Sequence, residues 1–400
     1  MITVDLINEL CSQVGENTDL QNGISDEVIK SKITEAVIEK SHVIPLSANK
    51  KIELIKLVFN RMRGMDVLQP LIDNEEITEI MVNGPENIFI EKQGNIQPVH
   101  MQCDPKQLED IIQKIVSSVN RTVNEANPIC DARLQDGSRV HVVMKPLALD
   151  GPILTIRKFS KTPMDMEKLL SYGSLTKEAA HMLRKLVVAR YNIFVCGGTG
   201  SGKTTFLNAL SNFIPKDERI ITIEDTAELQ ITGVSNLVRL ETRNANPDGE
   251  GQITIRDLIR AGLRMRPDRI VVGEVRGEEA LDMLQAMNTG HEGSLSTGHG
   301  NSCKDMISRL ETMVLTAAPI PLESIRKQIA SALDVIIFLS RMKDKSRKVM
   351  EISEVTGFSD GEVTLNPLYK FDLTDDNSSG ELKRTGSDMI NKEKFKIYGV

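Results

Sequence analysis

The chain has 400 residues and carries 56 acidic against 49 basic side chains, a net charge of −7. Hydrophobic residues make up 40% and charged residues 26%, which is typical of a soluble globular protein with two or three domains. Aromatic residues are only 4%, with no tryptophan. Scarce stacking residues and an acidic balance argue against nucleic acid as the partner, although they do not exclude a local basic channel.

The cysteines and the lack of long apolar runs indicate a cytoplasmic protein. The five cysteines, an odd number without a CxxC pair, are typical of reduced thiols. The first residues lack a basic segment followed by an apolar one, and no apolar run reaches the length of a membrane span. We therefore expect any membrane contact to be peripheral or made through a partner.

Two regions with different patterns of apolar residues come first along the chain. Residues 1–69 show apolar positions at helical spacing, interrupted by Pro45, and predict a helical N-terminal segment. Residues 70–160 combine alternating and helical patterns and predict an α+β N-terminal domain. Its predicted elements are strands near 77–82 and 87–91, a helix over 108–119, a hairpin around Asp136-Gly137 and a strand over 153–159.

A linker and a second α/β region follow. Residues 161–175 are polar and predict the linker, and residues 176–400 alternate strands with helices, which favours a parallel sheet with a C-terminal β-hairpin extension. Residues 375–386 are polar and turn-rich and predict a mobile loop. The predicted elements are a helix over 176–190, strands over 192–196, 219–225, 269–275 and 334–339, and a hairpin around Ser359-Asp360-Gly361.

A glycine-rich loop lies inside this α/β region. Residues 197–204 read Gly-Gly-Thr-Gly-Ser-Gly-Lys-Thr, after a buried strand and before apolar residues at helical spacing. The glycines let backbone N–H groups turn toward phosphate oxygens, and the start of the following helix adds its dipole. The sequence therefore predicts a P-loop that binds a nucleoside triphosphate in a RecA-like core. The expected nucleotide-binding residues are Gly197, Gly198, Thr199, Gly200, Ser201, Gly202, Lys203, Thr204 and Thr205.

Charged residues at the ends of neighbouring strands predict the rest of the site. Lys203 can reach the β- and γ-phosphates, and the Thr204 hydroxyl can ligate Mg²⁺. Residues 220–223 lead into Glu224-Asp225, where one carboxylate could orient water or accept its proton; alternatively, Asp225 caps a following helix. Residues 270–272 lead into Gly273-Glu274, whose carboxylate can hold Mg²⁺ through water.

Two histidines lie among small polar residues. No cysteine or carboxylate cluster near His291 and His299 has the spacing of metal ligands, which argues against a metal site there. His299 follows Ser296-Thr297-Gly298, and it is either a hydrogen-bonded structural residue or a sensor of the γ-phosphate at the end of another strand.

Four motifs, in this order, resemble the Walker A, Asp box, Walker B and His box of the secretion ATPase superfamily. That superfamily covers the hexameric ATPases of type II secretion, type IV pili and type IV secretion. Two upstream segments are similar to those of CpaF-like ATPases of tight adherence (Tad) pili. The motifs are 197–204, Thr222–Glu228, Leu263–Arg276 and Ser296–Ser302, and the upstream segments are Leu68–Pro85 and Leu154–Phe159.

The resemblance implies a role for each matching residue. Glu224 matches the glutamate that acts on the attacking water, Glu274 the Walker B glutamate near Mg²⁺, and His299 the histidine that faces the γ-phosphate. Arg139 and Arg157 fall in the segment that closes over the nucleotide in relatives, where a guanidinium would stabilise transferred phosphate. A surface strand position is the alternative for each arginine. The chain lacks the tetracysteine module of type II secretion ATPases, so no structural zinc is expected.

The resemblance also implies partners and a location. ATP and Mg²⁺ are the expected cofactors, and Lys203 joins the expected catalytic residues. We expect a ring, a hexamer, that lies in the cytoplasm at the inner face of the cytoplasmic membrane. Its expected partner is an integral membrane platform protein of a pilus or secretion system. Two rival interpretations are a nucleic-acid translocating motor such as a DNA-transfer ATPase, and a nucleotide-binding module without turnover.

Overall fold

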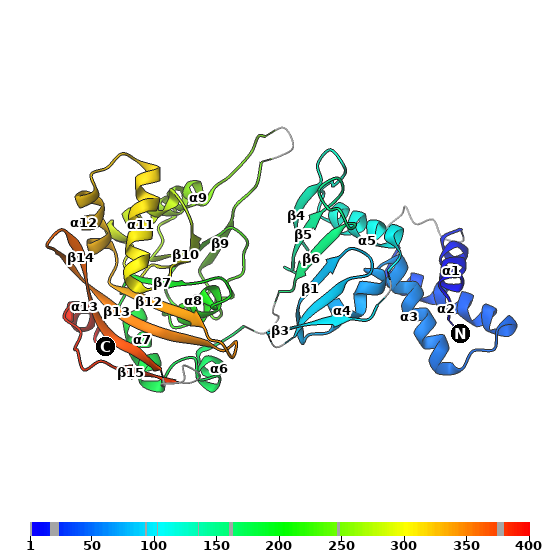
Figure 1. Ribbon diagram of the computed structural model, residues 1–400, viewed down its shortest axis with the longest axis horizontal. Helices are drawn as coiled ribbons and strands as arrows, with labels where there is room; N and C mark the ends of the chain where they lie inside the picture. The colour runs from blue at the N-terminus through cyan, green and yellow to red at the C-terminus, as the bar shows by residue number, and fades with distance from the viewer. Residues whose placement is uncertain are drawn as a thin grey trace. The chain divides into compact units, whose positions relative to one another are not determined.

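The computed structural model describes residues 2–16, 24–92, 94–101, 103–134, 136–159, 163–245, 249–373 and 380–400. Contacts divide the chain into two compact units, Met1–Ser160 and Lys161–Val400 (Figure 1). Both units contain a sheet with helices, so the predicted mixed α/β fold is confirmed. The finer domain boundaries stay predictions.

Three helices open the first unit. They are α1 (Val4–Glu16), α2 (Asp26–Val43) and α3 (Ala48–Met62). Pro45 lies between α2 and α3, and Ser47 caps α3 by accepting a hydrogen bond from the Lys50 amide. The helices bury a common apolar cluster that includes Leu10, Ile33 and Leu54. The cluster explains the helical spacing of apolar residues in this part of the sequence.

A six-stranded antiparallel sheet forms the rest of the first unit. Its strand order is β3-β2-β1-β6-β5-β4, and the apolar face of helix α5 packs on it. The predicted Asp-Gly hairpin is confirmed as the β4–β5 pair. The elements are the short helices η1 (Asp66–Leu68) and α4 (Gln69–Asp73), α5 (Pro105–Ser118), and strands β1 (Ile77–Asn83), β2 (Ile88–Lys92), β3 (Asn95–Val99), β4 (Ile129–Arg133), β5 (Arg139–Val143) and β6 (Ile153–Arg157).

The second unit is built on a nine-stranded sheet of order β15-β14-β13-β12-β7-β11-β10-β8-β9. The six strands from β12 to β9 are parallel, and β13, β14 and β15 continue the sheet antiparallel beside β12. The strands are β7 (Ile193–Gly197), β8 (Ile220–Glu224), β9 (Leu237–Glu241), β10 (Arg269–Val275), β11 (Leu295–His299), β12 (Val335–Arg341), β13 (Arg347–Ser359), β14 (Glu362–Leu373) and β15 (Gly380–Arg384).

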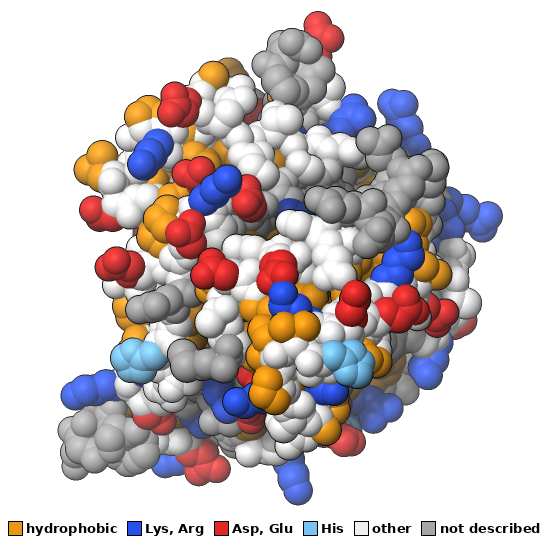
Figure 2. Space-filling view, turned by 90° about the vertical axis from the view of Figure 1, so that its right-hand side faces the viewer, with side chains coloured by type: hydrophobic (Ala, Val, Ile, Leu, Met, Phe, Trp, Pro, Cys, Tyr) orange, Lys and Arg blue, Asp and Glu red, His pale blue; other side chains and the backbone are white. Residues whose placement is uncertain are grey.

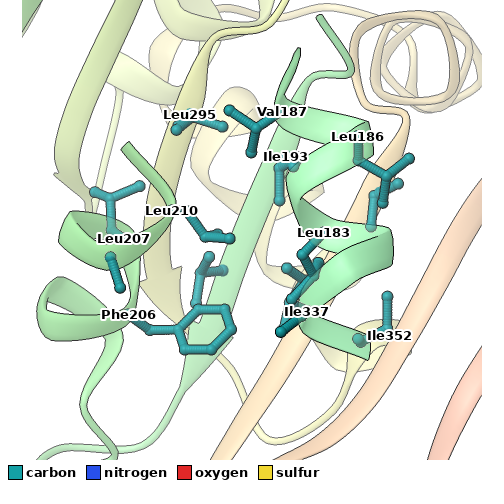
Figure 3. Packing of buried hydrophobic residues seen from close by; sticks show 14 of the residues in the cluster. Leu183, Leu186, Val187, Ile193, Phe206, Leu207, Leu210, Leu295, Ile337 and Ile352 are labelled. Atoms are coloured by element: carbon teal, nitrogen blue, oxygen red, sulfur yellow. The ribbon is translucent and has the colours of Figure 1, made fainter. Parts of the chain in front are cut away.

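Helices pack on both faces of this sheet and bury two apolar clusters. In one cluster, Phe206 and Leu210 of α8 pack with Ile193 of β7 and with α7 (Figure 3). This packing holds the start of α8 at the end of the central strand β7. The helices are α6 (Met166–Ser171), α7 (Lys177–Val188), α8 (Lys203–Ser211), α9 (Ile255–Gly262), η2 (Leu263–Met265), α10 (Glu279–Asn288), α11 (Cys303–Ala317), α12 (Leu322–Ala332) and α13 (Glu393–Tyr398).

Two sequence predictions differ from the structure in this unit. Residues 161–175, predicted as a linker, include α6, whose Met166 and Leu169 are buried in the apolar core. Residues 375–386, predicted as a mobile loop, include β15, which pairs with β14 and buries Leu382. The part of that loop up to residue 379 lies outside the described residues. In both segments a few apolar side chains within polar sequence decide the structure.

Candidate active site

The phosphate loop follows β7 in the middle of the parallel strands. Gly200 and Gly202 have φ values of +71° and +91°, and α8 begins directly afterwards at Lys203. Left-handed backbone of this kind strains every residue except glycine. A side chain at Gly197 would meet the Leu339 carbonyl oxygen of β12 at 2.5 Å, so that position also requires glycine. The loop therefore has the geometry in which backbone amides turn inward toward an anion.

Lys203 is folded back onto this loop. Its side chain is buried, and Nζ donates a hydrogen bond to the Gly198 carbonyl oxygen at 3.1 Å. Nζ also lies 3.4 Å from Nδ1 of His299, which ends β11. Burial lowers the pKa of the Lys203 ammonium below its ordinary value of 10.5, and the nearby carboxylate of Glu274 opposes that shift. An incoming phosphate would supply the counter-charge that this buried cation favours.

Glu274, on β10, lies between His299 and Arg276 and contacts both. Nε2 of His299 lies 2.9 Å from Oε1 of Glu274, although without the alignment of a hydrogen bond. Oε2 of Glu274 accepts hydrogen bonds from Nε and Nη2 of Arg276 at 2.9 and 2.7 Å. Nη1 of Arg276 lies 3.8 Å from the Asp225 carboxylate. The structure thus brings Lys203, His299 and Glu274 together, and it adds Arg276, for which the sequence suggested no role.

Glu224 is the most buried carboxylate of the site, with 2% of its surface exposed at the end of β8. Oε2 accepts hydrogen bonds from the amides of Glu228 and Leu229 at 2.7 and 2.8 Å. Oε1 is buried and has no hydrogen-bond partner among the described residues. Burial raises the pKa of the Glu224 carboxyl above its ordinary value of 4.5, and the two amides oppose the shift. The arrangement leaves one oxygen able to accept a proton from water.

The alternative role for Asp225 as a helix cap is wrong. The stretch between β8 and β9 is fully described and contains no helix. Oδ1 of Asp225 instead accepts a hydrogen bond from the Thr242 hydroxyl at 2.9 Å. The carboxylate therefore joins the loop after β8 to the loop after β9.

Arg139 and Arg157 lie in the first unit, on neighbouring strands. They are directly opposite each other in the β5–β6 pair, so their side chains share one face of the sheet. Arg133 of β4 lies opposite Arg139, and Glu79 of β1 lies opposite Arg157. The row continues from Glu79 to Glu91 of β2, so three arginines are followed by two glutamates. The sequence did not single out Arg133, because its place in the row depends on strand register.

The residues present fit a nucleoside triphosphate with Mg²⁺. The positive-φ glycines and buried Lys203 suit phosphate groups, and Oε1 of Glu224, which has no hydrogen-bond partner among the described residues, suits a water molecule. Thr204 in the first turn of α8, together with Glu274, would hold the metal. The described residues contain no group of three His, Cys, Asp or Glu side chains that could hold a metal ion.

Comparisons with known proteins identify the family. Residues 61–385 match the family described as "Type II/IV secretion system protein". The chain belongs to this family. It is accordingly an ATP hydrolase, which sets aside the interpretation as a module without turnover. Among the described helices, none has both the length and the apolar character needed to cross a bilayer.

Relatives cover most of the chain. A putative conjugal transfer protein of Mycobacterium tuberculosis is 33% identical over 75% of this chain and 86% of its own. The type IV secretion system protein VirB11 of Brucella suis is 33% identical over 68% of this chain and 83% of its own. The pilus retraction motor PilT with bound ADP shares the fold, with a TM-score of 0.53 and 20% identity over 84% of this chain and 87% of that one.

Proposed function

We propose that the protein is a Mg²⁺-dependent, hexameric ATPase motor of the cytoplasm that drives pilus assembly or protein secretion. The observation that supports it best is the cluster of Lys203, His299 and Glu274 at a glycine loop of phosphate-binding geometry. Within the family, the segments Leu68–Pro85 and Leu154–Phe159 favour a motor of the CpaF type, which serves Tad pili. The family match covers both segments.

Each residue of the cluster has a task in this proposal. The loop amides and Lys203 bind the β- and γ-phosphates, and Oε1 of Glu224 accepts a proton from the attacking water. Thr204 and Glu274 hold Mg²⁺, which neutralises charge on the phosphates when bound. His299, in contact with both Lys203 and Glu274, senses whether the γ-phosphate is present. Release of phosphate would then free Lys203 to return to the Gly198 carbonyl.

Arg139 and Arg157 supply positive charge from the first unit in this proposal. Closure of that unit over the nucleotide would bring one or both guanidinium groups to the transferred phosphate. Opening after hydrolysis would move the unit away again. Repeated around a ring, this motion would act on an integral membrane platform protein at the inner face of the cytoplasmic membrane. VirB11 as a secretion system protein and PilT as a pilus motor support such a role.

A paired genetic and biochemical experiment tests the proposed function. Cells that carry Glu224→Gln should lose surface filaments or secreted protein, while cells that carry the control Glu241→Gln should keep them. Glu241 lies opposite Glu224 on the edge strand β9 and is exposed, so the control removes a nearby carboxylate outside the site. Sedimentation of the purified protein with a non-hydrolysable ATP analogue should show six copies per particle. Intact filaments and secretion in Glu224→Gln cells would refute the motor role.

DNA transfer is the second candidate, and it rests on the relatives. Several of them carry the names of conjugal transfer proteins, among them one from Mycobacterium tuberculosis and TrbB from Rhizobium radiobacter. The composition argues against direct DNA contact, and Figure 2 shows acidic and basic side chains interspersed on one face of the molecule. A DNA-binding titration across salt concentrations separates the candidates, because phosphate contacts give an affinity that falls steeply with salt. Tight, salt-sensitive binding would favour the DNA motor.

A further inference from the structure

The turn between β12 and β13 lies beside the phosphate loop. Strand β12 runs parallel to β7 with Leu339 opposite Gly197, and it continues to Arg341 while β7 gives way to the loop. A tight turn, closed by the Ser346 carbonyl accepting from the Met342 amide, leads back into β13. Arg347 then lies directly opposite Arg341. The fold therefore places two arginines, far from the loop in sequence, at the edge of the sheet where the phosphates bind.

Arg347 contacts two of the glycines that give the loop its shape. Its Nε donates a hydrogen bond to the carbonyl oxygen of Gly200 at 3.1 Å. Its Cδ lies 3.3 Å from the place that a Cβ at Gly202 would occupy. These two glycines have the positive φ values that turn the loop amides inward. The guanidinium thus uses a carbonyl of the loop and leaves the amides for phosphate.

We propose that Arg347 is a positioning residue that holds the phosphate loop in its phosphate-receiving shape before nucleotide binds. Glycine visits many backbone conformations, so a loop with four glycines loses much entropy when it takes one shape. A charged donor on the Gly200 carbonyl, with its stem against Gly202, restricts both glycines in advance. Such restriction raises nucleotide affinity, because less ordering is left to the binding step.

The neighbouring residue keeps Arg347 in place. Nζ of Lys348 donates hydrogen bonds to the carbonyl oxygens of Gly173 and Tyr172, at 2.7 and 3.3 Å, where α6 ends. Successive side chains of a strand point to opposite faces, so Lys348 anchors the start of β13 while Arg347 reaches the loop. The first residues of β13 are therefore fixed by contacts on both sides.

The cross-strand pair of Arg341 and Arg347 gives a second reason to connect Arg347 with nucleotide binding. Like charges directly opposite each other destabilise an antiparallel pair. Arg341 and Arg347 nevertheless lie opposite each other, with Nη1 of Arg341 only 3.7 Å from where a Cβ at Gly200 would be. The carbonyl dipole of Gly200 offsets part of this repulsion, and bound phosphate would offset more. Nucleotide binding and the position of Arg347 are therefore expected to reinforce each other.

Three variants of the 400-residue chain test the proposal. Arg347→Met keeps the stem against Gly202 but removes the donor, and Arg347→Lys restores a donor within reach of the Gly200 carbonyl. Lys343→Met removes one positive charge from the same turn, at a residue for which the described structure shows no contact with the loop. Titration with a fluorescent ADP analogue gives Kd, steady-state ATP hydrolysis gives KM and kcat, and hydrogen exchange of residues 198–206 without nucleotide reports loop order.

Arg347→Met should raise Kd and KM roughly tenfold, as expected for loss of a charged hydrogen bond, with kcat changed much less. Exchange over residues 198–206 should become faster in this variant alone. Arg347→Lys should recover most of the affinity, and Lys343→Met should match the parent protein. An unchanged Kd in Arg347→Met, equal losses in Arg347→Met and Lys343→Met, or no recovery in Arg347→Lys would each overturn the positioning role. Because all readouts concern nucleotide handling, they do not depend on which machinery the motor serves.

Discussion

Arg139 of β5 lies directly opposite Arg157 of β6, on the same face of the six-stranded sheet. Arg133 extends this row on one side, and Glu79 followed by Glu91 extends it on the other. Burial raises the pKa of the Glu79 carboxyl above 4.5, the nearby Glu91 carboxylate raises it further, and the charge of Arg157 opposes the rise. The row therefore carries three arginines at one end and two glutamates at the other. In the proposed function, the arginine end of the row receives the transferred phosphate.

Arg157→Ala should lower ATP turnover far more than it lowers folding stability. Loss of an arginine that stabilises transferred phosphate costs roughly 10³-fold in rate in the stronger cases, whereas a surface arginine contributes almost nothing. Thermal midpoint and ATPase rate are measured on one preparation, with Arg121→Ala as the control at an exposed arginine of the same unit. An unchanged rate, or a rate loss matched by general unfolding, would exclude Arg157 from the active site. Arg139→Ala, tested in parallel, decides whether one arginine or the pair acts.

Glu224→Gln should still bind ATP but stop hydrolysing it. Glutamine keeps the shape of the side chain and the hydrogen bonds from the Glu228 and Leu229 amides, yet it cannot accept a proton from water. Retention of ATP on the variant after gel filtration, with no phosphate release, is the expected result. The control Glu241→Gln should turn over normally. Normal hydrolysis by Glu224→Gln together with failure of Glu274→Gln would mean that the two glutamates exchange roles.

The same substitution should raise stability at neutral pH. Burial holds the folded-state pKa of Glu224 above 4.5, so the folded state binds this proton more tightly than the unfolded state does. Stability is therefore lost as pH rises from 4.5 through the folded-state pKa, and the loss is complete above it. Glutamine carries no charge at any pH, so the variant does not undergo this loss of folding stability. The thermal midpoint of Glu224→Gln should exceed that of the parent protein at pH 8, and the gap should shrink toward pH 5. A gap that is constant with pH would show that the Glu224 charge is not its cause.

Glu274→Gln should change the Mg²⁺ requirement as well as the rate. In the structure, the Glu274 carboxylate pairs with Arg276 through Oε2, and its Oε1 lies next to His299. An uncharged side chain would hold a metal-bound water more weakly, so more Mg²⁺ should be needed for half-maximal ATPase activity. A Mg²⁺ titration of the ATPase rate measures this. A lower rate at an unchanged half-maximal Mg²⁺ concentration would remove Glu274 from the metal site and leave it as a partner of His299 and Arg276.

Local patterns in the sequence predicted the parts of the site that lie within one strand–loop–helix stretch. The glycine loop, its strand and the start of α8 follow from residues 193–211 alone. The Asp-Gly pair fixed the β4–β5 hairpin, because that dipeptide matches the left-handed backbone of a tight turn. Apolar runs that end in Glu224 and Glu274 likewise correspond to β8 and β10.

Contacts that depend on strand order and register could not be predicted from local sequence patterns. The bond from Arg347 to Gly200 joins residues 147 positions apart, and it exists because β12 packs beside β7 after a long crossover. Strand β3 was missed because four of its five residues are exposed and show no apolar alternation. The six-residue helix α6 is shorter than the window in which helical periodicity can be recognised, so a polar linker was the natural interpretation.

ATP hydrolysis by Lys203→Ala tests the central claim most directly. The account places the chemistry at the loop of residues 197–204, where Lys203 is a buried cation folded against the Gly198 carbonyl and next to His299. Phosphate release by the purified variant should fall to background, and its nucleotide affinity should weaken, while Lys177→Ala at an exposed helix start should behave as the parent protein. Undiminished phosphate release by Lys203→Ala would contradict the account, because hydrolysis would then occur without this loop.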